Sequence, residues 1–231
     1  RDLGGLKTTS GKRIKYGMIF RGTNLTSTTA DEKKYLVEFM NIGLDNDLRD
    51  GSGGSSNRDE PFANTSYDVD YCGPGYGTGI GSTTGSSLTN PDRAKLTMQA
   101  FIDCAKRGKA SYFHCAIGSD RTGFWGLLIE GLLGVSVKDC SIDFELTGFA
   151  GGVTSGDRPR NSTGYLFFQG MENSVGSGSN VQFKGFSKYD GNTFQEKVAN
   201  YVKTLSNSTY NFTDETIEAF RNAVLEDDPD Q

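Results

Sequence analysis

The chain has 231 residues, which is the length of one large domain or at most two small ones. Its net charge of −5 provides no basic field to hold nucleic acid or an anionic lipid surface. No stretch approaches the ~18 consecutive apolar residues of a membrane span. One histidine and four scattered cysteines do not make a structural metal site. We therefore expect one domain without a metal or another cofactor.

Hydrophobic periodicity predicts strands that alternate with helices along the chain. The strands are predicted at residues 18–20, 42–48, 67–71 and 110–113. The helices are predicted at residues 31–41, 91–108, 123–133, 135–146, 193–205 and 213–225. This alternation favours an α/β fold with a mainly parallel central sheet flanked by helices.

Two of the predicted helices have recognisable capping residues. The first follows either Thr29 or Asp31, and the helix at residues 135–146 has Ser136 as its cap. The periodicity of the first helix predicts a buried stripe of four residues, Tyr35, Leu36, Phe39 and Met40.

Three segments rich in Gly, Ser, Thr and Asn lie near residues 51–57, 73–90 and 148–191. We expect loop insertions there, within a single domain that spans residues 1–231. These loops are consistent with two interpretations, a lid over a site or plain surface insertions. Such loops are common in exported bacterial proteins and favour a secreted or cell-surface location over a cytoplasmic one. The start at Arg1 rather than at methionine fits either a trimmed product or an engineered piece of the chain.

The segment at residues 111–123 combines a buried strand, a tight loop that starts at Cys115, and a helix start. Successive N–H groups in such a loop, together with the helix dipole, form an anion-binding site. A phosphate there would meet the planar fork of Arg121. The same positive field favours the thiolate of Cys115, which is a nucleophile. The loop backbone would bind the phosphate at Ala116, Ile117, Gly118 and Ser119.

Each of these residues also has a simpler interpretation when it is taken alone. Cys115 could be an inert buried thiol, and His114 a core histidine. Asp120 and Arg121 could be merely an adjacent charge pair. The joint spacing favours the site, because strand, cysteine, glycine, arginine and helix all occur in the required order.

The pattern from His114 and Cys115 to Arg121 and Thr122 resembles the signature of cysteine-dependent phosphatases of the protein tyrosine phosphatase superfamily. Further matches point to one branch, the bacterial tyrosine/lipid phosphatase family typified by the secreted mycobacterial phosphatase. They are Arg1-Asp2-Leu3-Gly4-Gly5, Gly11-Lys12-Arg13, Gly17, Phe20-Arg21-Gly22, Asp47-Leu48-Arg49, Gly134-Val135 and Asp143-Phe144. The resemblance spans nearly the whole chain and implies a protein tyrosine phosphatase-like fold.

The resemblance also implies roles for the site residues. Cys115 would form a phosphocysteine intermediate, and Arg121 would clamp the phosphate. Asp120 matches the aspartate that the family has inside the loop, and it would act as general acid and base. Thr122 could donate a hydrogen bond to the cysteine sulfur, and His114 would orient the loop. Two further residues, Asp47 and Arg49, would support the loop from below.

Other carboxylates are weaker candidates for the acid, because residues 73–88 contain none. Asp68 and Asp70 are the next candidates for this role after Asp120. Asp45 and Asn46 occupy strand positions where the family usually has apolar residues, and nothing in the sequence explains them.

The sequence thus predicts a phosphomonoester hydrolase, most simply a protein tyrosine phosphatase, with dual specificity left open. Its substrate would be a phosphorylated protein or a phosphorylated small molecule. One alternative is a phosphoinositide or inositol-phosphate phosphatase, which Ser119 disfavours because it stands where family loops often have lysine. The basic residues that would serve this alternative are Arg158, Arg160 and Lys184. Another alternative is a module that recognises phosphate without turnover.

Overall fold

The computed structural model describes residues 1–49, 61–73, 91–118, 120–147, 186 and 189–230, and the structural statements below concern these residues. The predicted insertions near residues 51–57, 73–90 and 148–191 lie almost wholly outside them. The single-domain organisation over residues 1–231 therefore stays a prediction. None of the helices within the described ranges is long and apolar enough to cross a membrane.

A four-stranded parallel sheet confirms the predicted α/β fold. Its order is β2 (Ile19–Gly22), β5 (Ala110–His114), β3 (Ile42–Asp47) and β4 (Asp70–Cys72). Both central strands, β3 and β5, are buried along their whole length, as is typical of a parallel sheet covered on both faces. Three strands end level with one another, because His114 pairs with both Gly22 and Asp47.

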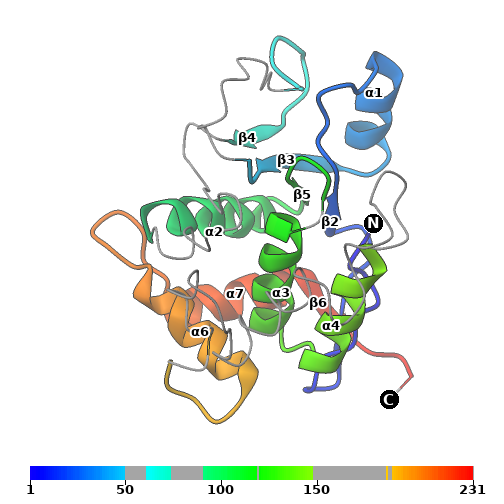
Figure 1. The fold of residues 1–231 in the computed structure, drawn as a ribbon. Coiled ribbons are helices and arrows are strands. Elements are labelled where there is room, and N and C mark those ends of the chain that lie inside the picture. Colours follow the sequence, from blue (N-terminus) through cyan, green and yellow to red (C-terminus); the bar gives the residue numbers. More distant parts are fainter. Residues whose placement is uncertain (50–60, 74–90, 119, 148–185, 187–188, 231) are drawn as a thin grey trace.

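Helices cover the two faces of this sheet unequally. In Figure 1, α1 (Ala30–Glu38) lies on one side of the sheet, and α2 (Pro91–Lys106) and α3 (Asp120–Leu133) lie on the other. The latter side has the larger hydrophobic core, to which α4 (Val137–Leu146), α6 (Phe194–Thr204) and α7 (Asp214–Val224) contribute. The predicted caps are confirmed at Thr29 and Ser136, whose side chains each accept from the backbone N–H three residues further on.

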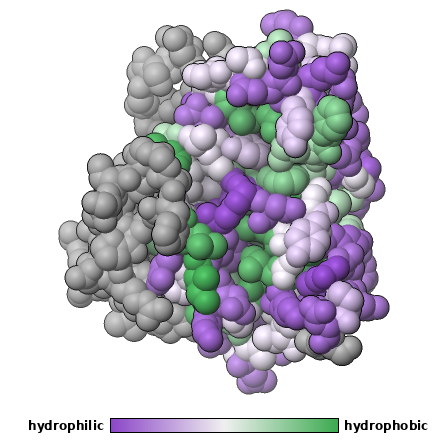
Figure 2. All heavy atoms as spheres, turned by 90° about the vertical axis from the view of Figure 1, so that its right-hand side faces the viewer, coloured by the Kyte–Doolittle hydropathy of each residue, from purple (hydrophilic) through white to green (hydrophobic). Residues whose placement is uncertain are grey.

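The predicted buried stripe of α1 is wrong for its two aromatic residues. Tyr35 and Phe39 are 57% and 75% exposed and stack on each other, with ring centroids 5.4 Å apart. Leu36 and Met40 pack, partly buried, against the smaller core. The period is helical as expected, but this short helix contacts the sheet through a narrow face, so the outer aromatic residues stay at the surface. Figure 2 shows apolar side chains at the surface at the level of α1.

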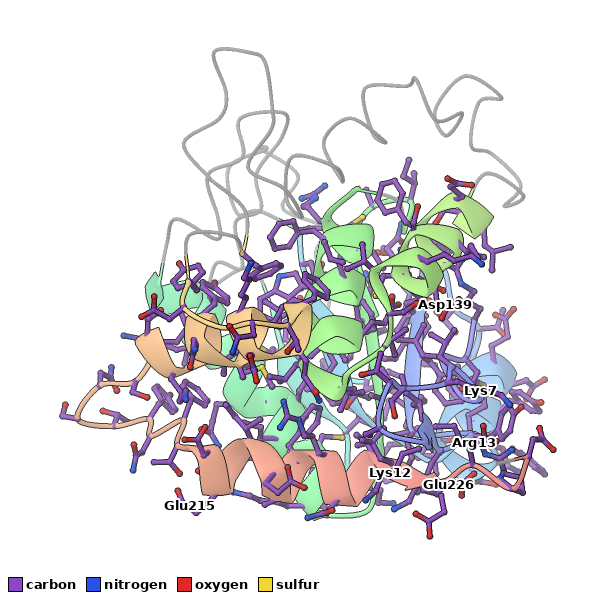
Figure 3. All side chains as sticks on the ribbon, turned by 90° about the horizontal axis from the view of Figure 1, so that it is seen from below. Lys7, Lys12, Arg13, Asp139, Glu215 and Glu226 are labelled. Atoms are coloured by element: carbon purple, nitrogen blue, oxygen red, sulfur yellow. The ribbon has the colours of Figure 1, made fainter. Side chains whose placement is uncertain are left out.

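A second, two-stranded sheet was not predicted. It pairs β1 (Lys12–Ile14) with β6 (Leu225–Asp227) in antiparallel fashion and so joins the two ends of the described chain. Arg13 Nε donates to Oε1 of Glu226 at 2.7 Å, and Figure 3 shows the two residues next to each other. Arg13 and Glu226 are 213 residues apart, so their pairing leaves no local sequence pattern from which this sheet could be predicted.

Candidate functional site

The strand before Cys115 and the helix after it lie closer together along the chain than the sequence analysis predicted. We call residues 115–119 the cysteine loop. It follows His114, the last residue of β5, and α3 begins directly after it at Asp120. The predicted strand at residues 110–113 therefore ended one residue too early, and the predicted helix at residues 123–133 began three residues too late. The helix dipole favours an aspartate in the first turn, which accounts for the earlier helix start.

Cys115 is 2% exposed and is surrounded by groups that favour its thiolate. Burial alone would raise the pKa of the thiol, but four interactions together lower this pKa below its ordinary value. The hydroxyl and the backbone N–H of Thr122 and the N–H of Ile117 act on the thiol to lower its pKa, and Arg121 adds its positive charge. The Thr122 hydroxyl is buried and has no hydrogen-bond partner among the described residues, so its predicted hydrogen bond to the sulfur stays a prediction.

The other three cysteines have the opposite environment. All four cysteines are free and buried, so no disulfide joins them. Burial raises the pKa of Cys72 to about 12, and it also raises the pKa of Cys104 and of Cys140. Cys115 is therefore the one cysteine of this chain whose surroundings stabilise a thiolate.

The segment that follows β2 holds the cysteine loop in place. The carbonyl oxygen of Ala116 accepts hydrogen bonds from Thr23 Oγ1 at 2.9 Å and from Asn24 Nδ2 at 2.7 Å. The sequence analysis missed both residues. A usable signal was their position a few residues after the predicted strand at 18–20, because parallel strands bring the segments after them to one edge of the sheet.

Four of the predicted phosphate-binding residues are described, and they follow Cys115 along the loop and into α3. Ala116 and Ile117 are exposed, Gly118 is buried with a φ of 74°, and Arg121 is half-buried in the first turn of α3. Ser119 and the side chain of Asp120 lie outside the described part of the structure. So do the basic residues of the phosphoinositide alternative, Arg158, Arg160 and Lys184.

Asp47 and Arg49 form a forked ion pair beside the end of β5. Arg49 Nε lies 2.8 Å from Oδ1 of Asp47, and Nη2 lies 2.6 Å from Oδ2. The hydroxyl of Tyr71 donates to the same Oδ2 at 3.1 Å. Burial alone would raise the pKa of Asp47, but the Arg49 bonds hold it below its ordinary value. The N–H of Leu48 donates to the His114 carbonyl at 2.8 Å, which ties this pair to the strand below Cys115.

His114 lies between Cys115 and the unexplained Asp45. Its ring Nδ1 is 3.1 Å from the carbonyl oxygen of Cys115, and Nε2 is 2.9 Å from Oδ1 of Asp45. Burial alone would lower the pKa of His114, but the hydrogen bond and charge of Asp45 raise it above its ordinary value. The position of the ring agrees with the orienting role expected for it.

Asp68 and Asp70, the reserve candidates for the acid, lie at the wrong edge of the sheet. Arg107 Nη2 is 2.7 Å from Oδ2 of Asp70, and Nη1 is 3.7 Å from Oδ1 of Asp68. In the register of the sheet, Asp70 is level with Ser111 through Leu44, three residues before His114. Three residues of strand separate the two edges by about 10 Å, so these carboxylates do not reach Cys115.

An α/β fold with a cysteine loop between the central strand and a helix start is the architecture expected of a phosphatase. A model of the tyrosine phosphatase family matches residues 1–226, and the chain belongs to this family. It is also similar to the putative tyrosine-protein phosphatase of Cupriavidus necator, with 28% identity over 156 residues. That match covers 60% of this chain and 56% of the relative, so the chain spans little more than half of the relative's length.

Proposed function

We propose that this protein is a cysteine-dependent phosphomonoester hydrolase whose preferred substrates contain phosphotyrosine. Membership of the tyrosine phosphatase family supports phosphate ester hydrolysis as the reaction class. The observation that carries the cysteine mechanism is the place of Cys115, which is buried in the loop between the end of β5 and the start of α3, where Arg121 and the N–H groups of Ile117 and Thr122 lower its pKa. A buried thiol without such a field would have a raised pKa, as the other three cysteines do.

In the first step, the thiolate of Cys115 attacks the phosphorus from the side opposite the tyrosine oxygen. The new bond joins sulfur to phosphorus, and the bond from phosphorus to the phenolic oxygen breaks. The leaving oxygen takes a proton from Asp120. The guanidinium fork of Arg121 and the loop N–H groups stabilise the charge on the three equatorial oxygens.

In the second step, water attacks the phosphocysteine while Asp120 accepts its proton. The sulfur–phosphorus bond breaks, and Cys115 leaves as a thiolate with inorganic phosphate as product. The Thr122 hydroxyl and the N–H groups that lower the thiol pKa also stabilise this leaving thiolate. The same contacts therefore assist both steps.

Phosphotyrosine is favoured over a multiply phosphorylated headgroup by Ser119, which brings no positive charge to the loop. Dual specificity extends the same mechanism to phosphoserine and phosphothreonine. The alternatives use the same site differently. A phosphoinositide or inositol-phosphate phosphatase would hydrolyse phosphate from a lipid headgroup or an inositol phosphate, and a binding module would hold a phosphate group without hydrolysing it.

The test is phosphate release from three substrates: a phosphotyrosine peptide, its phosphoserine counterpart and phosphoinositide vesicles. The Cys115→Ser variant is the control, because it retains the loop but lacks the nucleophile. We expect release from the phosphotyrosine peptide by the wild type alone. Phosphopeptide binding without release by either protein would establish the recognition module instead, and faster release from the vesicles would establish the lipid phosphatase.

A further inference from the structure

Asp45 is a fully buried carboxyl group in β3, a strand on which every residue is buried. An unpaired carboxylate is far more costly to bury than an apolar side chain, so such a residue needs a partner. The partner is His114, whose Nε2 lies 2.9 Å from Oδ1 of Asp45. Oδ2 has no hydrogen-bond partner among the described residues. The contact with His114 is therefore what compensates for this burial.

The protonation of the His114 ring follows from its two contacts. Nδ1 is 3.1 Å from the carbonyl oxygen of Cys115, and a carbonyl oxygen only accepts hydrogen bonds. Nδ1 must therefore carry a hydrogen. Nε2 and Asp45 share one further proton, either as imidazolium and carboxylate or as a neutral ring that accepts from the carboxylic acid. In both forms, Asp45 fixes the tautomer and the orientation of the ring.

The other charged and titratable groups near the ring are already engaged or more distant. Oδ1 of Asp47 lies 3.9 Å from Nδ1, but Asp47 is bound by Arg49 and by the Tyr71 hydroxyl. The ring of Tyr112 is 5.8 Å from the imidazole, between centroids, and its hydroxyl donates elsewhere. Among the described residues, Asp45 is thus the acidic group within hydrogen-bond distance of the imidazole.

We propose that Asp45 is a positioning residue for Cys115, holding His114 so that Nδ1–H binds the Cys115 carbonyl oxygen. This inference rests on the proposed function, in which Cys115 is the nucleophile. The Cys115 carbonyl and the N–H of Ala116 belong to one planar peptide unit. Holding that carbonyl therefore also fixes the start of the loop whose N–H groups surround the sulfur. Asp45 acts two contacts away from the reacting atom.

Two substitutions separate the hydrogen bond from the charge. Asp45→Leu removes the partner of the ring, whereas Asp45→Asn keeps a donor for Nε2 of the neutral ring. We expect the thiol pKa of Cys115 to rise in Asp45→Leu by about one unit, which makes alkylation by iodoacetamide at pH 6 about tenfold slower. Asp45→Asn is expected to lie between this variant and the wild type, as a partial rescue.

The neighbouring Asn46 provides a matched control. It is as deeply buried on the same strand, and its amide has no hydrogen-bond partner among the described residues. Asn46→Val disturbs β3 without touching the ring, so we expect the alkylation rate of Cys115 to stay at the wild-type value. A shift as large as that of Asp45→Leu would show a general effect of the strand and would overturn the proposal.

The wild type supplies a second measurement that needs no variant to fold. The chain contains one histidine, so its ring nitrogens give unambiguous NMR signals. We expect Nδ1 to be protonated throughout the pH range in which the protein is folded. A neutral ring protonated only at Nε2 would overturn the proposal, as would a folded Asp45→Leu variant with an unchanged thiol pKa.

These readouts do not depend on turnover. Failure of the proposed function would be seen as a wild type that releases no phosphate from any of the three substrates. Failure of the Asp45 proposal would leave phosphate release intact and would be seen in the thiol pKa or in the histidine tautomer alone.

Discussion

Gly118 of the cysteine loop packs directly against the backbone of Gly22 at the end of β2. A Cβ atom added at Gly118 would lie 2.6 Å from the carbonyl carbon of Gly22 and 3.1 Å from the N atom of Thr23. Gly118 also has a φ of 74°, a conformation that other residues rarely adopt. The loop can therefore take its position beside β2 only with glycine here.

Gly118→Ala should consequently displace the loop and reduce phosphate release at least about tenfold, because misplacement of reacting groups by about 1 Å costs about 10²-fold. Gly108→Ala is the matched control. Its φ is 65°, but no atom lies within 4 Å of the added Cβ. Both variants should lose about 1 kcal/mol of unfolding free energy from backbone strain, and only Gly118→Ala should lose activity. Equal activity in the two variants would contradict the packing argument.

Cys115 should be the first cysteine to react with iodoacetamide at pH 6. Its pKa is lowered, whereas burial raises the pKa of Cys72, Cys104 and Cys140. Lowering the pH further should slow the labelling of Cys115 as the thiolate becomes protonated. Peptide mass spectrometry after short exposure gives the order of labelling, and added vanadate should protect Cys115 specifically. Faster labelling of any other cysteine would contradict the assignment.

Arg121→Lys should separate charge from geometry. The substituted side chain retains the positive charge that favours the thiolate, so alkylation of Cys115 should remain fast. An ammonium group cannot bind two phosphate oxygens with a planar fork, so turnover should fall by about 10²–10³. Arg107→Lys at the opposite edge of the sheet is the control and should retain full turnover. An Arg121→Lys variant as active as the wild type would mean that the fork is not used.

The cysteine loop could be predicted because its chemistry is local in the sequence. Cys115, Arg121 and Thr122 follow one another within a short stretch of chain between a strand and a helix. The supports of the loop could not be predicted in this way. Thr23 and Asn24 reach Ala116 from 93 and 92 residues away, and Asp45 reaches His114 from 69 residues away.

Two of the expectations that failed share a physical cause. Helical periodicity predicts which residues of α1 share a face, but the packing of the whole fold decides how much of that face is covered, and Tyr35 and Phe39 stay exposed. Likewise, Asp68 and Asp70 were candidates for the general acid from their place in the chain. The direction of β4 places them at the amino edge of the sheet with Arg107.

Glu130 in α3 should make stability depend on pH. It is buried beside Asp143 and Arg21, which pair with each other, and burial raises the pKa of Glu130 well above its ordinary value of 4.5. An acid whose pKa is higher in the folded state than in the unfolded state contributes its full stabilisation at any pH below its unfolded-state pKa. This stabilisation is lost as the pH rises toward its folded-state pKa. Glu130→Gln stays neutral, so its unfolding free energy should not fall over this window.

The measurement is urea unfolding of the wild type and Glu130→Gln at several pH values from 4.5 upward. The difference in unfolding free energy should grow in favour of the variant as the pH rises. Glu218→Gln, at an exposed position of α7, should show no such trend. A difference independent of pH would mean that Glu130 is not held in its neutral form.

Asp120 is the remaining candidate for the general acid, since Asp68 and Asp70 are held by Arg107 at the far edge of the sheet. As the first residue of α3, Asp120 directly precedes Arg121 and follows the cysteine loop. Asp120→Asn should slow hydrolysis of phosphotyrosine by about 10²-fold or more, because the phenolic oxygen needs a proton as it leaves. An aryl phosphate with a strongly acidic phenol leaves unaided, so its hydrolysis should slow far less.

Asp70→Asn is the control for this comparison and should leave the hydrolysis of both substrates unchanged. Measuring the two substrates on each variant separates proton transfer from loop geometry, because a displaced loop slows every substrate alike. Equal losses on the two substrates in Asp120→Asn would mean that Asp120 shapes the start of α3 and donates no proton. A loss confined to phosphotyrosine would identify Asp120 as the acid, since only the step that needs a proton would have been affected.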